Sequence, residues 1–272
     1  MLYGLPYMGS KSDIAKNIVD ILPAADILID LFAGGCAITH AALLSGKWKK
    51  IIANDITDSP SLFLDAIHGK YHDCDKWISR EEFYLTKDKD AFVRLCWSFG
   101  NAQKNYLYSK ELEPYKKAIH KCLFGKTVKK RYLGFRAVVN EMGKISQQKR
   151  LNELQSLESL ERLQSLESLE ILQKDYREIP PPINAIVYCD PPYRNTASYL
   201  HDFDFIAFDD WCKRQIVPLF ISEYNFPFGE CIAEWKRASS LSAVSTNQTI
   251  EKLYALNWNK PKGMLMKQMD LF

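Results

Sequence analysis

The sequence lacks several signatures that would assign it to a class at once. Its longest apolar stretch, around Ala24 to Ala37, contains Asp26 and Asp30 and is too short to cross a bilayer. The N-terminus, MLYGLPYMGSKSD, has no basic start followed by an apolar run, so we expect no secretory signal. The seven cysteines include no Cys-x-x-Cys pair, which argues against a metal site and a disulfide framework. These absences predict a cytoplasmic protein without a membrane partner.

Two glycine-rich nucleotide signatures are missing as well. The full Gly-x-Gly-x-x-Gly fingerprint is absent, which makes a nicotinamide dehydrogenase improbable, and Gly9-Ser10-Lys11 is only a fragment of a P-loop. On its own this fragment is equally well an ordinary helix start capped by Ser10. What remains is a 272-residue chain with 47% hydrophobic and 25% charged residues, which is typical of a folded globular protein and excludes a disordered one.

The hydrophobic pattern predicts an α/β fold. Apolar runs that favour strands alternate with an Ala/Leu-rich helix over Ala37–Ser45, which Gly46 would end. Such alternation indicates a doubly wound parallel sheet. The expected strands cover residues 26–32, 51–53, 183–189, 216–222 and 253–258.

The net charge of +3 conceals an uneven distribution. Residues 58–150 contain 19 Lys+Arg and 11 Asp+Glu, a net of +8, so the rest of the chain carries −5. Within this block, residues 104–150 carry a net of +10 from 13 basic and 3 acidic residues, with tyrosines and phenylalanines interleaved. Such a segment suits a phosphate backbone and exposed bases, although a solvated helical face over core aromatics would give a similar composition.

A low-complexity segment follows the basic block. Residues 154–162 (LQSLESLER) and 163–171 (LQSLESLEI) are near-repeats, and leucines fall at every third position from Leu151 to Leu172. A three-residue step winds the leucines around an α-helix instead of lining one face, which argues against a coiled coil. A helix buried on several sides or a stretch with 3₁₀ character remains open. We interpret the segment as a spacer of variable length.

Three elements carry the candidate chemistry. Residues 30–36 (DLFAGGC) place small residues at a strand-to-helix turn, where a backbone can approach a ligand closely. Asp55 ends the next strand, where a carboxylate can accept hydrogen bonds from a ribose, although it could equally cap a helix. Asp190-Pro191-Pro192-Tyr193 follows a third strand; its carboxylate and a backbone carbonyl can accept both hydrogens of an exocyclic amine, and its aromatic ring can stack on a planar base.

In their order along the chain, these motifs resemble those of the adenine-specific (N6) DNA methyltransferases of the Dam-like class, and more narrowly its phage-type members. The resemblance spans roughly residues 1–57 and 170–272 and includes Tyr-x-Gly-Ser-Lys, Asp-x-Phe-x-Gly, Asn-Asp and Asp-Pro-Pro-Tyr. Ser222-Glu223-Tyr224 and the polar stretch Ser239–Lys252 also take part in it. One departure is Cys36, where the family often has a second glycine.

The resemblance implies a Rossmann-like class I S-adenosylmethionine-dependent methyltransferase sheet with a largely helical, basic target-recognition insertion. Residues 1–57 and 170–272 would form a discontinuous catalytic domain, 58–150 the DNA-recognition insertion and 151–169 the spacer. The implied reaction is methyl transfer from S-adenosylmethionine to the 6-amino group of a flipped adenine in double-stranded DNA. The resemblance also implies that the enzyme is a monomer and acts in the cytoplasm of a bacterial cell or a phage-infected host cell. Asp190, Pro191, Pro192 and Tyr193 would be catalytic. The cofactor would contact Tyr7, Lys11, Asp30, Phe32, Gly34, Asp55, Asp175, Tyr176 and Asp190.

DNA-contacting residues are expected in the basic insertion. One alternative to this function is an RNA adenine N6-methyltransferase, whose catalytic turn more often resembles Asn-Pro-Pro-Phe/Tyr. A second is an amino-cytosine methyltransferase, whose turn more often resembles Ser-Pro-Pro-Tyr. A third is a nucleic-acid-binding Rossmann-like protein without transferase activity. The recognition sequence and a pairing with a restriction nuclease are not readable from the residues. The candidates for DNA contact are Lys104, Asn105, Lys129, Lys130, Arg131 and Arg136.

The C-terminus carries a separate resemblance. The final residues QMDLF resemble the short peptide by which bacterial replication proteins dock on the sliding clamp. In that peptide Gln268 would stand first, and Leu271 and Phe272 would form the apolar plug. An ordinary tail is an equally good interpretation of five residues.

Overall fold

The computed structural model describes residues 3–71, 76–124, 167–194, 203–238, 248–258 and 267–270. The chain divides into two compact units. Unit 1 comprises Met1–Gly4, Ser10–Leu64 and Leu163–Phe272, and unit 2 comprises Leu5–Gly9 and Asp65–Arg162.

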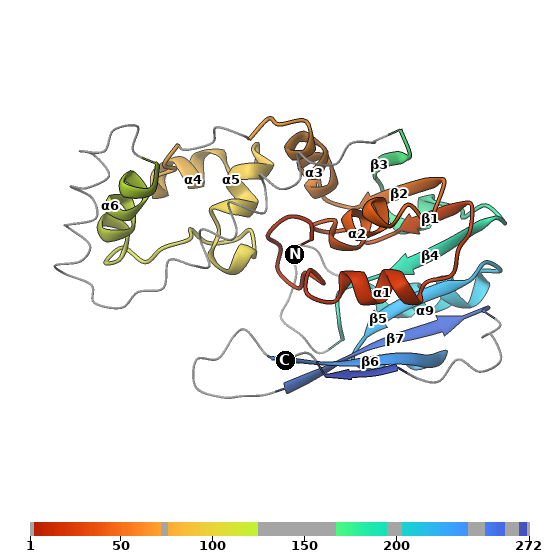
Figure 1. The fold of residues 1–272 in the computed structure, drawn as a ribbon. Coiled ribbons are helices and arrows are strands. Elements are labelled where there is room, and N and C mark those ends of the chain that lie inside the picture. Colours follow the sequence, from red (N-terminus) through yellow and green to blue (C-terminus); the bar gives the residue numbers. More distant parts are fainter. Residues whose placement is uncertain are drawn as a thin grey trace. The chain divides into compact units, whose positions relative to one another are not determined.

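Unit 1 is built on an eight-stranded sheet in the order β3-β2-β1-β4-β5-β7-β6-β8 (Figure 1). The first five strands in this order are parallel, β7 runs antiparallel to both β5 and β6, and β8 pairs parallel with β6. This order confirms the α/β expectation, and it reverses beside β1, where β2 lies on one side and β4 on the other. The strands are β1 Ile27–Asp30, β2 Lys50–Asp55, β3 Leu169–Gln173, β4 Ala185–Cys189, β5 Leu219–Glu223, β6 Glu230–Ala238, β7 Gln248–Leu256 and β8 Lys267–Asp270.

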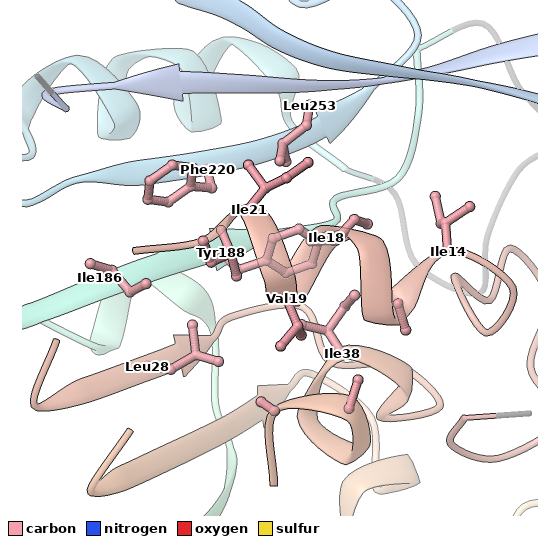
Figure 2. Close-up of a cluster of buried hydrophobic side chains, with 14 of the residues drawn as sticks. Ile14, Ile18, Val19, Ile21, Leu28, Ile38, Ile186, Tyr188, Phe220 and Leu253 are labelled. Atoms are coloured by element: carbon pink, nitrogen blue, oxygen red, sulfur yellow. The ribbon is translucent and has the colours of Figure 1, made fainter. Parts of the chain in front are cut away.

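Alternating side chains along the strands form one apolar core on each face of the sheet. In β4, Ile186 and Tyr188 point to one core and Val187 to the other, because successive side chains of a strand point to opposite faces. Helices α1 (Ala15–Ile21) and α2 (Ala37–Ser45) cover the first core, and α9 (Phe205–Arg214) covers the second. Figure 2 shows the α1 isoleucines packed against Leu28, Phe220 and Leu253 from the strands.

Helix α2 begins and ends as its sequence predicts. Its C-cap, Gly46, adopts the left-handed conformation with φ of 62° and lets the chain leave the helix. At the other end, Cys36 is also left-handed, with φ of 59°, which is uncommon for a residue with a side chain. Cys36 is the position where the resembling family often has glycine, and the conformation explains that preference.

Unit 2 is helical over its described part. Helix α3 (Ser59–Ile67) leads into it, followed by α4 (Arg80–Thr86), α5 (Ala91–Cys96), the 3₁₀ helix η1 (Phe99–Asn101) and α6 (Glu113–Phe124). Ser79 and Asp90 cap α4 and α5 by accepting hydrogen bonds from backbone amides. Buried aromatic residues supply its core: Phe83, Phe92, Trp97 and Tyr106.

Three of the sequence expectations need correction. The leucine-rich segment ends in a strand, because Leu169–Gln173 forms β3 and pairs with β2, whereas the sequence indicated strand character only from Leu172 on. Strand β6 was not expected, because residues 230–238 mix apolar and charged residues, even though Pro227 and Gly229 before them are a turn signal. Strand β8 covers residues that were interpreted as a clamp-docking peptide or an ordinary tail, not as part of the sheet. No helix among the described residues combines the length and the apolar character that crossing a membrane requires.

Candidate active site

Three carboxylates stand at the carboxyl edge of the parallel strands. Asp30 ends β1, Asp55 ends β2, and Asp190 directly follows β4. Because β1 pairs in parallel with both β2 and β4, these three residues lie at the same edge of the sheet. Open α/β sheets bind their ligands at this edge, beside the point where the strand order reverses.

Asp30 and Asp55 hold the turn that follows β1. One oxygen of Asp30, Oδ2, accepts hydrogen bonds from the Thr39 amide (3.1 Å) and hydroxyl (2.6 Å). Oδ2 of Asp55 accepts one from the Gly34 amide at 2.9 Å, and Oδ1 accepts two from Thr57. Burial, followed by the nearby negative charges of Asp190 and Asp55, raises the pKa of Asp30 to about 7. The edge is therefore acidic and crowded with like charge.

The N-terminal segment packs directly on this turn. The amide of Gly4 donates to Nδ1 of the buried His40 at 3.0 Å. Burial lowers the pKa of His40 to about 4, which keeps the ring neutral and able to accept this bond. A Cβ atom at Gly4 would lie 2.3 Å from the carbonyl oxygen of Gly35, so only glycine fits here.

Lys11 forms an ion pair with the carboxylate of the Asp-Pro-Pro-Tyr turn. Its Nζ atom lies 2.8 Å from both oxygens of Asp190 and 4.0 Å from Glu251. The Lys11 side chain is 5% exposed and that of Asp190 19%, so the ammonium is buried while the carboxylate keeps an accessible side. A carboxylate has about four acceptor positions, so the ion pair leaves room for further donors.

Tyr193 is held on three sides. Its hydroxyl donates to Oε1 of Glu251, Lys11 Nζ lies 4.7 Å from its ring centre, and the ring of Tyr224 meets it edge to face at 4.7 Å. Burial raises the pKa of Tyr193 well above its usual value, so the hydroxyl stays protonated as a donor. The ring is 6% exposed, which fixes its orientation beside Asp190.

Glu223, at the end of β5, secures the far side of the turn. Its carboxylate accepts from the Arg194 amide at 3.2 Å and from the Tyr224 amide at 2.8 Å. Burial raises the pKa of Glu223 to about 7. Arg194 in turn pairs with Asp209 of α9 at 2.5 Å. The turn is thus connected to three separate elements of unit 1.

The remaining residues expected at the cofactor lie in two places. Phe32 contacts Tyr176 with ring centres 5.4 Å apart, and Asp175 caps the 3₁₀ helix η2 (Tyr176–Glu178) and pairs with Arg177. Asp175 and Tyr176 follow β3, Phe32 follows β1, and all three belong to unit 1 with Asp30 and Asp190. Tyr7 belongs to unit 2.

Only part of the expected DNA-binding set can be located. Lys104 and Asn105 are exposed in the loop between η1 and α6. Phe99, whose amide donates to the carbonyl of Asn105, is exposed as well, at 67%. The expected contacts Lys129, Lys130, Arg131 and Arg136 lie outside the described residues.

The C-terminal motif also falls partly inside the described residues. Gln268 is in β8 and is in register with Glu234 of β6. Leu271 and Phe272 lie outside the described residues.

Two site residues escaped the sequence analysis as individuals. Glu251 lies within a stretch noted only as polar, and Thr39 within a helix noted only for its alanines and leucines. An acid at a buried position of a strand is a usable signal for Glu251, because its strand neighbours Leu253 and Ala255 on the same face are core residues.

Comparison with protein-family models gives a match over most of the chain. The family model described as D12 class N6 adenine-specific DNA methyltransferase matches residues 7–216. A crystal structure of a "putative methylase" from Haemophilus influenzae is similar to 92% of this chain and 90% of its own, at 11% identity and a TM-score of 0.30. No curated protein sequence matches at a significant level.

Proposed function

Because this chain belongs to the family of D12 class N6 adenine-specific DNA methyltransferases, we propose that it methylates adenine in double-stranded DNA with S-adenosylmethionine as the donor. The observation that carries this proposal is the Asp-Pro-Pro-Tyr turn at the carboxyl end of β4. Its carboxylate is fixed by Lys11 and its tyrosine by Glu251.

The acid-rich sheet edge suits this donor. Burial is the main cause of the raised pKa of Asp30, and the charges of Asp190 and Asp55 raise it further; a bound cation would relieve that repulsion. When bound, S-adenosylmethionine supplies a methyl group on a positively charged sulfur. Asp55 can accept hydrogen bonds from ribose hydroxyls in addition to those from Gly34 and Thr57, since each carboxylate oxygen has two acceptor positions. The aromatic pair of Phe32 and Tyr176 offers an apolar contact for an adenine ring.

Asp190 and the carbonyl of Pro191 would activate the target amine. The 6-amino nitrogen of adenine is a poor nucleophile because its lone pair is delocalised into the ring. When two acceptors receive hydrogen bonds from its two N–H groups, they favour a pyramidal nitrogen with a more available lone pair. The prolines fix the two acceptors in place, so positioning and electrostatics supply the acceleration.

The target base must leave the duplex to reach this turn. Chemistry on a base inside a stack requires extrusion of the nucleotide, and Tyr193 would hold the extruded ring by stacking. In unit 2, exposed Lys104, Asn105 and Phe99 combine charge, an amide and an aromatic ring, which suits DNA phosphates and bases.

Product analysis tests the proposal. The purified protein is incubated with duplex DNA and S-adenosylmethionine carrying a labelled methyl group, and the DNA is digested to nucleosides. We expect the label in N6-methyl-2′-deoxyadenosine only. Label in a cytosine nucleoside, in RNA but not in DNA, or in no nucleoside would overturn it. Asp190→Ala should abolish labelling even at saturating cofactor, and Asp210→Ala, which removes an exposed acid of α9, serves as the matched control.

We also propose that the C-terminal QMDLF docks on the bacterial sliding clamp. The support is its sequence, with Gln268 first and Leu271 and Phe272 last. Since Gln268 pairs with β6 as part of β8, docking requires this strand to leave the sheet. Pull-down by purified clamp should succeed with the full chain and fail without the last five residues; equal capture of both would overturn the proposal.

A further inference from the structure

We propose that Glu251 of β7 is a positioning residue for methyl transfer, acting through Tyr193 and Lys11. This inference rests on the proposed function of the Asp-Pro-Pro-Tyr turn. Glu251 belongs neither to that turn nor to the parallel strands, and it reaches the site from the antiparallel part of the sheet.

Its burial calls for an explanation other than packing. Glu251 is 1% exposed on the sheet face that Leu253 and Ala255 of the same strand give to the apolar core. A buried carboxylate costs several kcal/mol unless it is paired and hydrogen-bonded. Glu251 has both compensations, because its Oε1 accepts from the Tyr193 hydroxyl and lies 4.0 Å from Lys11 Nζ.

These two contacts act on the two ends of the turn. The hydroxyl contact fixes the rotation and tilt of the Tyr193 ring, on whose face a base would stack. The charge of Glu251 attracts the same ammonium that pairs with Asp190 at 2.8 Å. Lys11 is therefore shared between two carboxylates, and Glu251 holds it at a position where the outer side of Asp190 stays available to an amine.

The size of the effect follows from geometry. A displacement of about 1 Å in a positioned group costs on the order of 100-fold in rate. We expect Glu251→Ala, which removes both contacts, to lower kcat by about 10- to 100-fold with KM for DNA within about threefold. Glu251→Gln keeps an acceptor for the Tyr193 hydroxyl but loses the charge, so it should retain more activity than the alanine variant.

A double-mutant cycle with Tyr193→Phe tests the route. If Glu251 acts through the hydroxyl, Glu251→Ala should lower kcat much less in the Tyr193→Phe background than in the wild-type chain. Glu234→Ala is the matched control: Glu234 lies on the neighbouring strand β6 and contacts Lys252 at 3.7 Å. It should leave kcat unchanged.

A second readout does not depend on turnover. With 3-fluorotyrosine incorporated at position 193, the ¹⁹F resonance should shift in Glu251→Ala and stay unchanged in Glu234→Ala. Wild-type kcat in a folded Glu251→Ala or Glu251→Gln protein, an additive cycle, or an unshifted resonance would overturn the inference. Failure of the wild-type chain to methylate adenine would instead overturn the proposed function, so the two failures are distinguishable.

Discussion

The two units treat charge in opposite ways. Every buried Asp, Glu, Lys or Arg side chain among the described residues belongs to unit 1: Lys11, Asp30, Asp55, Glu223 and Glu251. In unit 2 the buried polar residues are Ser98, Gln103 and His120, and lysines such as Lys104 are exposed. Burying a charge lowers stability unless the charge is paired. Unit 1 accepts this cost and holds its buried charges in fixed positions, which suits a catalytic site. Unit 2 keeps its charges in water, which suits a polyanion of variable sequence.

Among the substitutions that test this difference between the units, we expect the largest effect on stability and activity at Lys11. Lys11→Met removes the ammonium between Asp190 and Glu251 and leaves two carboxylates facing each other. We expect the free energy of unfolding to fall by about 3 kcal/mol and methylation by at least about 100-fold. Lys16→Met removes an exposed ammonium paired with Asp20 and should leave the denaturant midpoint close to that of the wild type. Equal denaturant midpoints for the two variants would contradict the role of the buried pair.

The next effect concerns the backbone of unit 1. Gly4→Ala adds a Cβ 2.3 Å from the Gly35 carbonyl at a φ of +71°, whereas Gly46→Ala at a φ of +62° meets nothing within 4 Å. The second variant should lose about 1 kcal/mol from the left-handed conformation alone. Gly4→Ala should lose about 1 to 3 kcal/mol more, because the segment must move off the turn. Thermal unfolding of both variants measures the difference, and an equal loss would show that the close packing at Gly4 carries no energy.

A smaller, pH-dependent effect is expected at Asp30. The pKa of its carboxyl is raised from 3.8 to about 7 in the folded chain, so between pH 4 and 7 the folded state holds a proton that the unfolded state has released. Stability therefore falls as pH rises through this window and levels off above it. Asp30→Asn removes this dependence. The difference between the thermal midpoints of the variant and the wild type should therefore be a few degrees more in the variant's favour at pH 8 than at pH 5. The same difference at both pH values would show that Asp30 titrates normally.

The smallest effect is expected in unit 2. Lys104→Glu should weaken DNA binding by about 3- to 10-fold and reduce the slope of log Kd against log salt by about 1, with kcat at saturating DNA unchanged. Lys16→Glu makes the same charge change in unit 1 and should leave DNA affinity within about twofold. Fluorescence anisotropy at several salt concentrations measures both. A fall in kcat with an unchanged affinity for DNA would contradict the assignment of DNA binding to Lys104 in unit 2 and of catalysis to unit 1.

Helix α2 and four of the parallel strands, β1, β2, β4 and β5, were predictable because their signals are local. Gly46 ends α2 where the sequence predicts, and β1, β2 and β4 each end at or before an aspartate that the motifs single out. Contacts between distant residues were not predictable from local patterns. Lys11 pairs with Asp190 across 179 positions and Tyr193 with Glu251 across 58, and both depend on the sheet order. The start of strand β3 was missed because it overlaps the leucine repeat, and its partner, β2, is more than 100 residues away.

The most direct test of the central claim is the single-turnover rate of Asp190→Ala with cofactor and DNA both saturating. Because saturation removes differences in binding, the rate reports only what the carboxylate does for the amine. We predict a fall of at least about 1,000-fold relative to wild type, with Asp210→Ala unchanged. A rate within tenfold of wild type would contradict the assignment of Asp190 and with it the proposed mechanism.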